Sequence, residues 1–169
     1  LGSPALSKPA AVAIGRIGGP AATAALSKAY ETAAGEGRRL LAASLLEAAD
    51  GLLAANEPDA AAALYTTLSA DRALPAPVRT AAFIGTISAA GPRAPGTLVS
   101  MLGGDDADAR AAAVARIGKD VPADGIGPVC DLLPRLPEPV QVQVLAALSR
   151  YPAARVRPAK DTPLATAID

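Results

Sequence analysis

Residues 105–118 read DDADARAAAVARIG, and the order of residue types in this stretch predicts a short helix. Asp105 or Asp106 can cap its first turn, because a carboxylate accepts hydrogen bonds from the free backbone N–H groups there. Gly118 suits the left-handed conformation that often ends a helix. The apolar residues recur at helical spacing and are expected to form the buried face. They are Ala111, Val114, Ala115 and Ile117.

A second helix is predicted shortly after this one. Pro128 can occupy its first turn, where the missing N–H of proline is not needed. Val129, Leu132 and Leu133 then form an apolar face at helical spacing. Residues 105–135 are therefore expected to form one helix pair.

Four other parts of the chain have the same character, a run of small and branched apolar residues followed by a turn with glycine or proline. The aligned anchor residues lie 31, 39, 30 and 31 positions apart, and they are Ile14, Leu45, Ile84, Val114 and Leu145. A period of this size indicates a solenoid of helix pairs. The 39-residue separation is explained by two longer helices, which are expected at 38–55 and 58–69 around a turn at Asn56 and Pro58.

The expected fold is all-α, an α-α superhelix of about five antiparallel helix pairs within residues 1–155. Alanine makes up about a quarter of the chain and has the highest helix propensity. The expected units are 4–34, 36–70, 75–104, 105–135 and 137–155. Within them, helices are expected at Thr80–Ala90, at Thr97–Leu102 and from Pro139 to about Arg150. Residues 156–169 lose the helical period and are expected to be a tail or the start of a further repeat.

The composition argues against several classes of function. Sixteen Lys and Arg residues balance sixteen Asp and Glu residues, so net charge gives no argument for nucleic acid as a partner. No apolar run reaches the ~18–20 residues of a membrane helix, so membrane insertion is not expected. Histidine, the commonest general base and metal ligand, is absent from the sequence. We therefore predict no catalytic, cofactor-binding or metal site.

Three features of the sequence could indicate a site, and a structural interpretation is favoured for each. Cys130 has no evident activating base and is expected to be a small buried hydrophobe. Asp105, Asp106 and Asp108 could suggest calcium, but the spacing lacks that of a calcium hand, and helix capping explains them. The glycines of GRIGG at 15–19 lack the spacing of a phosphate loop and are expected to form a hinge between helices.

The motifs PAPVRTAA at 75–82 and DADARAAA at 106–113, each followed by a small-residue turn and a short helix, resemble the HEAT-repeat family. The most similar type is the short bacterial repeat also found in phycobilin lyases. The resemblance implies that Arg79 and Arg110 join a polar ladder between repeats, with Arg38 or Arg39 in the longer unit. In the fifth unit Gln141 replaces the arginine. Residues 51–68 also resemble a tetratricopeptide hairpin, without its tryptophan.

A looser resemblance is carried by the long second unit and by residues 131–151, DLLPRLPEPVQVQVLAALSRY. These are similar to alanine-rich HEAT regions of large multidomain proteins from Planctomycetes and Verrucomicrobia. Such regions often accompany a 3-keto-disaccharide hydrolase domain or a cytochrome domain. This resemblance would imply an exported parent protein, and without it a cytoplasmic location is expected.

The leading functional hypothesis is a non-catalytic scaffold that binds a protein partner through its second helices. Candidate surface residues are Lys28, Tyr65, Ser100 and Arg135, although Tyr65 could instead pack between helices. The alternative, implied by the repeat type, is a bilin lyase-like activity on a tetrapyrrole. A DNA-binding HEAT-like protein, similar to the alkyl-base glycosylases, is a third option, which neutral charge and 2% aromatic residues argue against.

Overall fold

The computed structural model describes residues 13, 19–119 and 126–150. Within these residues the chain is helical and forms no strand, so the predicted all-α class is confirmed. The α-helices are α2 (Gly19–Thr32), α3 (Gly35–Ala54), α4 (Pro58–Ala70), α5 (Ala76–Ala89), α6 (Ala94–Gly103), α7 (Ala107–Arg116), α8 (Gly127–Leu132) and α9 (Glu138–Leu148). Two short 3-10 helices, η1 (Gly91–Arg93) and η3 (Leu133–Arg135), lie between α5 and α6 and directly after α8.

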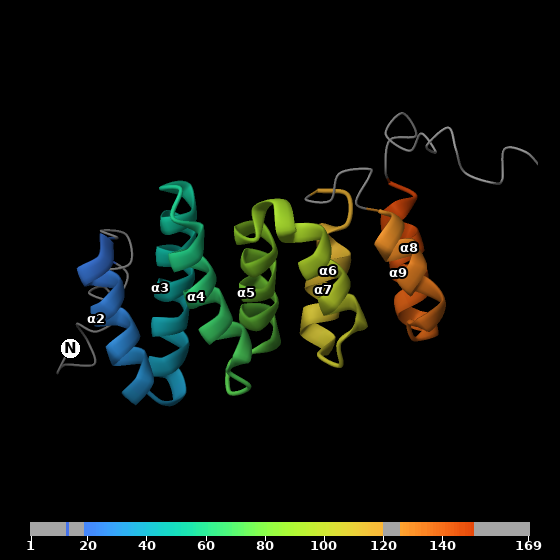
Figure 1. Ribbon diagram of the computed structural model, residues 1–169. Coiled ribbons are helices and arrows are strands. Elements are labelled where there is room, and N and C mark those ends of the chain that lie inside the picture. The colour runs from blue at the N-terminus through green and yellow to red at the C-terminus, as the bar shows by residue number, and fades with distance from the viewer. Residues whose placement is uncertain (1–12, 14–18, 120–125, 151–169) are drawn as a thin grey trace, which may run out of the picture.

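The helices follow one another along a single row from α2 to α9 (Figure 1). Helix α4 packs against both α3 and α5, while α5 also packs directly on α7, and α7 on α9. The turns that precede α3, α5, α7 and α9 all lie at one edge of this row (Figure 1), which we call the turn edge. Equivalent helix starts therefore lie side by side, although they are far apart in the sequence.

Local turn chemistry sets several helix ends where the sequence predicts them. Asp106 is the N-cap of α7, and its carboxylate accepts hydrogen bonds from the backbone N–H groups of Asp108, at 2.9 Å, and Ala109, at 3.3 Å. Asn56 and Gly118 both have positive φ, at 63° and 92°, as left-handed turn residues do. Asp106 and not Asp105 is thus the cap, and the predicted role of Gly118 is confirmed.

The predicted face of α7 is wrong in part. Ala111 and Ala115 are exposed, and Val114 is only half-buried. The buried residues are Ala109, Ala112, Ala113 and Ile117. Alanines occur on every face of this helix, so the apolar pattern gives little contrast between its faces. Packing against both α5 and α6 decides which of these alanines are buried.

The core is a series of small clusters between successive helices rather than one large centre. One cluster includes Leu26, Leu45 and Leu68, and another includes Leu98 and Val144. Such clusters depend on close helix approach, because alanine contributes little apolar area.

One such close approach involves a glycine of α5. A Cβ atom at Gly85 would lie 2.3 Å from the ring of Tyr65, so only glycine fits beside this tyrosine. Tyr65 is 1% exposed, and its hydroxyl donates a hydrogen bond to Asp50 on α3. One aromatic residue thus ties α3, α4 and α5 together.

Several sequence expectations lie outside the described residues. They are the anchor Ile14, most of the hinge at 15–19, and the tail at 156–169. Among the helices that the structure does describe, none is long and apolar enough to cross a membrane.

Candidate functional site

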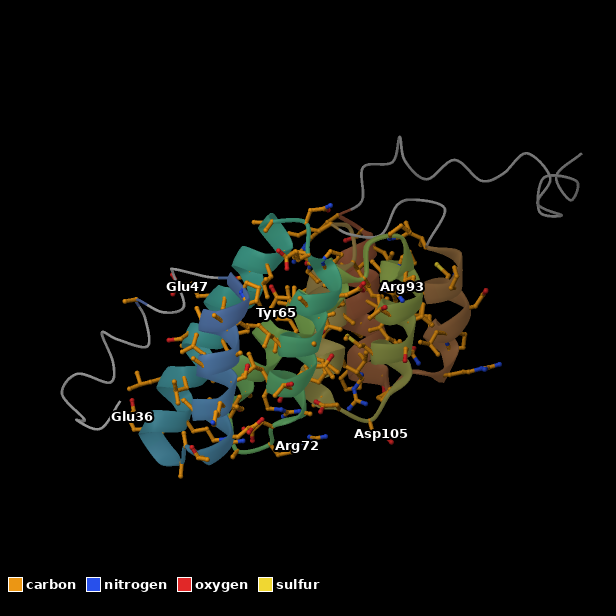
Figure 2. The ribbon with its side chains drawn as sticks, turned by 60° about the vertical axis from the view of Figure 1, so that its left-hand side comes forward. Glu36, Glu47, Tyr65, Arg72, Arg93 and Asp105 are labelled. Atoms are coloured by element: carbon orange, nitrogen blue, oxygen red, sulfur yellow. The ribbon has the colours of Figure 1, made fainter. Side chains whose placement is uncertain are left out.

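The four candidate surface residues do not form one site. Lys28, Ser100 and Arg135 are exposed. Lys28 belongs to α2 and Arg135 to η3, which lie toward opposite ends of the row (Figure 1). Tyr65, which is labelled in Figure 2, is not a surface residue, since its ring packs against Gly85 of α5 and its hydroxyl is bonded to Asp50. The structural interpretation of Tyr65 is therefore correct, and its place on a binding surface is wrong.

A more regular set of polar residues lies along the turn edge. Each is the fourth residue after the N-cap of its helix, and the N-caps are Ala34, Pro75, Asp106 and Pro137. We call this set the ladder, and it consists of Arg38, Arg79, Arg110 and Gln141. Every member donates a hydrogen bond to a backbone carbonyl that precedes its own helix. These carbonyls lie at or just beyond the end of the previous helix, where they lack partners within the helix.

Arg79 makes the most extensive contacts of the ladder. It is only 6% exposed, and its Nε donates to the carbonyl oxygen of Ser69 at 3.1 Å. One terminal nitrogen donates to Asp106 at 2.5 Å, and the other donates to Asp108. Arg79 thereby joins the end of α4 and the start of α5 to the first turn of α7.

Arg38 occupies the equivalent place one helix pair earlier. Its Nε lies 2.6 Å from the carboxylate of Asp71, and one terminal nitrogen donates to the carbonyls of Tyr30 and Ala33, both at 3.1 Å. The hydroxyl of Tyr30 also donates to Asp71, while the guanidinium lies 4.3 Å from the centre of the Tyr30 ring. Of the two arginines proposed for this unit, Arg38 makes the contact. Within the described residues, the ion pair that Arg39 forms is an exposed one with Glu36.

The contacts of the ladder shift the ionisation of its acids. Burial raises the pKa of Asp71, but hydrogen bonds from Tyr30 and Arg38 outweigh it and hold that pKa below its usual value. Burial likewise opposes ionisation of Asp106, yet the N–H groups of Ala109 and Asp108 and the charge of Arg79 lower its pKa overall. Burial, together with Asp71, raises the pKa of Tyr30 to about 12. The folded state thus favours charged acids and a neutral tyrosine at this edge.

Arg110 differs from the two earlier arginines. It donates to the carbonyl of Gly104 at 2.6 Å, but no carboxylate in the described part of the chain lies within ion-pair distance of it. The turn that follows α8 carries Arg135 in place of an acid. Arg110 and Arg135 both line a pocket of about 340 Å³, together with Asp105. We call this space, between the α6–α7 and α8–α9 turns, the junction pocket.

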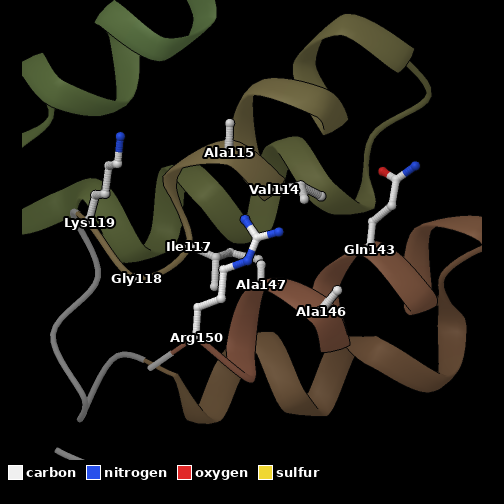
Figure 3. A pocket seen from close by; sticks show the side chains of 9 residues that line it. All are labelled: Val114, Ala115, Ile117, Gly118, Lys119, Gln143, Ala146, Ala147 and Arg150. Carbon is white, nitrogen blue, oxygen red and sulfur yellow. The ribbon is translucent and has the colours of Figure 1, made fainter. Parts of the chain in front are cut away.

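A second pocket lies between the C-terminal halves of α7 and α9 (Figure 3). It has a volume of about 410 Å³, and Lys119 and Arg150 line it together with small apolar side chains such as Ala115 and Ala146. Beyond it, α9 exposes Val142 and Leu145, which are 62% and 52% accessible. A third pocket, of about 400 Å³, lies at the earlier border between the turns before α3 and α5 and is lined by Arg38 and Arg39. Each of the three pockets thus presents two cationic side chains, and at the earlier border Arg38 is already paired with Asp71.

The remaining chemical candidates have structural explanations or are corrected. Asp106 and Asp108 are engaged by Arg79, which accounts for two members of the acidic triplet, and Asp105 is exposed. No group of three potential metal ligands occurs in the residues that the structure covers. Cys130 is exposed, so the expectation of a buried thiol is wrong. Helix α8 is short, and it buries the neighbouring Val129 instead.

Sequence reasoning missed the acids of the ladder as arginine partners. Asp71 was assigned no role, and Asp106 was identified only as a cap. A usable signal exists in the register, because an arginine at the fourth position after the N-cap recurs at Arg38, Arg79 and Arg110.

Comparisons of the chain with protein-family models, with curated proteins and with solved structures found no match.

Proposed function

We propose that this chain is a non-catalytic module of stacked helix pairs, of the HEAT type, that binds a protein partner. The observation that carries this proposal is the common register of the ladder. Four helices place a polar side chain at the same position, and each side chain contacts the carbonyl end of the preceding segment. Equivalent units stacked in this way produce a long surface suited to protein recognition.

The use of the buried polar groups supports a structural role for them. The arginines and aspartates of the turn edge form hydrogen bonds across helix junctions. Arg38 bonds to Asp71, and Arg79 bonds to Asp106, to Asp108 and to the carbonyl of Ser69. A side chain held in this way stabilises the stack, and its charge is already compensated. The ladder therefore acts as a connection between units rather than as a set of reacting groups.

The tyrosines bear on the alternative of a tetrapyrrole-binding protein. Tyr30 and Tyr65 are 3% and 1% exposed, and their hydroxyls are bonded to Asp71 and Asp50. Neither ring is available to stack on a pigment. These two residues thus favour the protein-binding module over the bilin lyase-like alternative.

The test is a capture experiment with three arms. The full chain is immobilised and exposed to lysate of the source organism, to biliverdin, and to duplex DNA at low salt. We expect saturable binding of a protein, whose identity mass spectrometry gives, and protection of amides on adjacent helices in hydrogen exchange of the purified complex. Binding of biliverdin or DNA without any protein partner would contradict the proposal.

A further inference from the structure

We propose that the junction pocket binds a carboxylate from an acidic segment of a partner protein, with Arg110 and Arg135 as the recognising residues. This inference rests on the proposed function and adds to it the chemistry of the partner. It follows from a comparison of the three arginine positions of the ladder.

At the first two positions the chain itself supplies a carboxylate. Arg38 receives Asp71, which lies 33 residues further along, and Arg79 receives Asp106 and Asp108. In both cases the acid belongs to the turn or helix start of the following unit. The turn edge is therefore built to place a carboxylate against an arginine at each junction between units.

At the third position the following unit supplies no acid to the arginine. Glu138, the first residue of α9, is exposed and forms no ion pair with Arg110 in the described part of the chain. The segment that leads into α9 reads Leu133-Pro134-Arg135-Leu136-Pro137, which contains a second cation instead. Arg110 uses one terminal nitrogen for the carbonyl of Gly104. A guanidinium carries five N–H donors, so most of its capacity is left for an external acceptor.

The shape and charge of the junction pocket fit a carboxylate attached to an apolar segment. Arg110 and Arg135 place two positive charges against the single exposed carboxylate of Asp105, which lies outside ion-pair distance of both. Leu132 and Leu136 supply apolar wall on the same pocket. Paired guanidinium groups bind a planar carboxylate through short, charge-assisted hydrogen bonds. A glutamate or aspartate flanked by leucine is thus the matching element of a partner.

The proposal is tested on the full chain by NMR with two synthetic peptides. The probe is acetyl-Ala-Leu-Glu-Leu-Ala-amide, and its control carries glutamine in place of glutamate. We expect the glutamate peptide alone to shift the Nε–H signals of Arg110 and Arg135 and the amide of Gly104 in a saturable way. Equal shifts with both peptides, or displacement by inorganic phosphate but not by acetate at equal ionic strength, would overturn the carboxylate assignment.

Two charge-matched variants locate the site. Arg110→Gln is expected to weaken peptide binding about tenfold, the effect of losing one charge-assisted contact. It should fold normally, because Gln141 makes the same carbonyl bond at the equivalent position, to Leu136 at 2.8 Å. Arg93→Gln removes the same charge from an exposed residue outside the pocket and should leave binding unchanged. Equal affinity in wild type and Arg110→Gln would overturn the proposal.

Failure of this inference is distinguishable from failure of the proposed function. A captured protein partner whose affinity is the same for wild type, Arg110→Gln and Arg135→Gln would overturn the junction pocket as its site and leave the binding module intact. The peptide titration needs no captured partner, so it measures the pocket separately.

Discussion

The junction between α5 and α7 and the junction between α7 and α9 use the same backbone position in opposite ways. At the first, Arg79 is 6% exposed and bonds to a carbonyl and to two aspartates. At the second, Arg110 keeps the carbonyl bond, has no such acid, and borders an open pocket. The carbonyl contact is set by helix register, whereas the acid must come from another unit. One position can therefore close a junction or leave it available to a ligand.

The largest expected effect separates these two arginines. Arg79→Met should lower the free energy of unfolding by about 3–5 kcal/mol, because it removes the buried guanidinium from two partly buried aspartates. Asp106 then retains only its ion pair with the exposed Arg72 and its bonds to backbone N–H groups. Arg110→Met removes a hydrogen bond to one carbonyl and should cost about 1 kcal/mol. Urea unfolding followed by circular dichroism measures both. Equal losses would mean that the two junctions do not differ as their contacts indicate.

A glycine substitution tests the tight packing between α4 and α5. Gly85→Ala forces a methyl group into the Tyr65 ring and should destabilise the chain by about 1–3 kcal/mol. Gly51→Ala is the matched control, since Gly51 lies inside α3 with open space around it. There alanine should stabilise the helix by about 0.5–1 kcal/mol. A thermal melt in which both variants shift in the same direction would show that the Tyr65 contact does not set this packing.

The two junctions with arginine–aspartate pairs should also make stability depend on acid pH. Asp71 and Asp106 have pKa values in the folded state below the ordinary 3.8. Their contribution is therefore present above that value and is lost as the pH falls through the folded-state pKa. Denaturation midpoints between pH 6 and pH 2 should fall less steeply for Asp71→Asn than for wild type. Asp105→Asn removes the same charge at an exposed position and serves as the control.

The smallest expected effect is a gain in stability from a substitution at the junction pocket. Arg135→Glu supplies an acid in the turn that follows α8 and should stabilise the chain by about 0.5–1 kcal/mol if it pairs with Arg110. Arg93→Glu makes the same charge change away from the pocket. The melting temperature should rise for the first variant relative to the second. A lower melting temperature for Arg135→Glu would indicate that the pocket does not accept a carboxylate from this turn.

Features with local causes could be predicted from the sequence. The cap at Asp106, the turn at Asn56 and the left-handed Gly118 all follow from residue chemistry within a few positions. The helical class follows from composition and periodicity in the same way. Each of these depends on the preferences of a short segment alone.

Features that depend on contrast or on distant partners could not be predicted. The sequence pattern predicts that Ala111 and Ala115 are buried, because an alanine-rich helix has no distinct polar face, but both are exposed. Tyr65 is buried through a glycine twenty positions away, and no local pattern indicates that contact. Asp71 meets Arg38 across 33 positions. The junction pocket likewise depends on bringing two turns together, although each of its arginines had been singled out separately.

The arginine–aspartate pairs of the ladder are directional, because the arginine of one unit pairs with an acid of the next unit along the chain. The turn at residues 71–79 carries both Asp71, which serves the preceding unit, and Arg79, which reaches the following one. At 106–110, Asp106 serves the preceding unit in the same way, and Arg110 stands at the position from which Arg79 reaches the following unit. A tandem duplication of such a unit would thus bring a matched acid and arginine at each new border, and the array could lengthen without any further substitution. Lengthening after α8 is different, because the turn there supplies no acid, and an added unit would need one at that border.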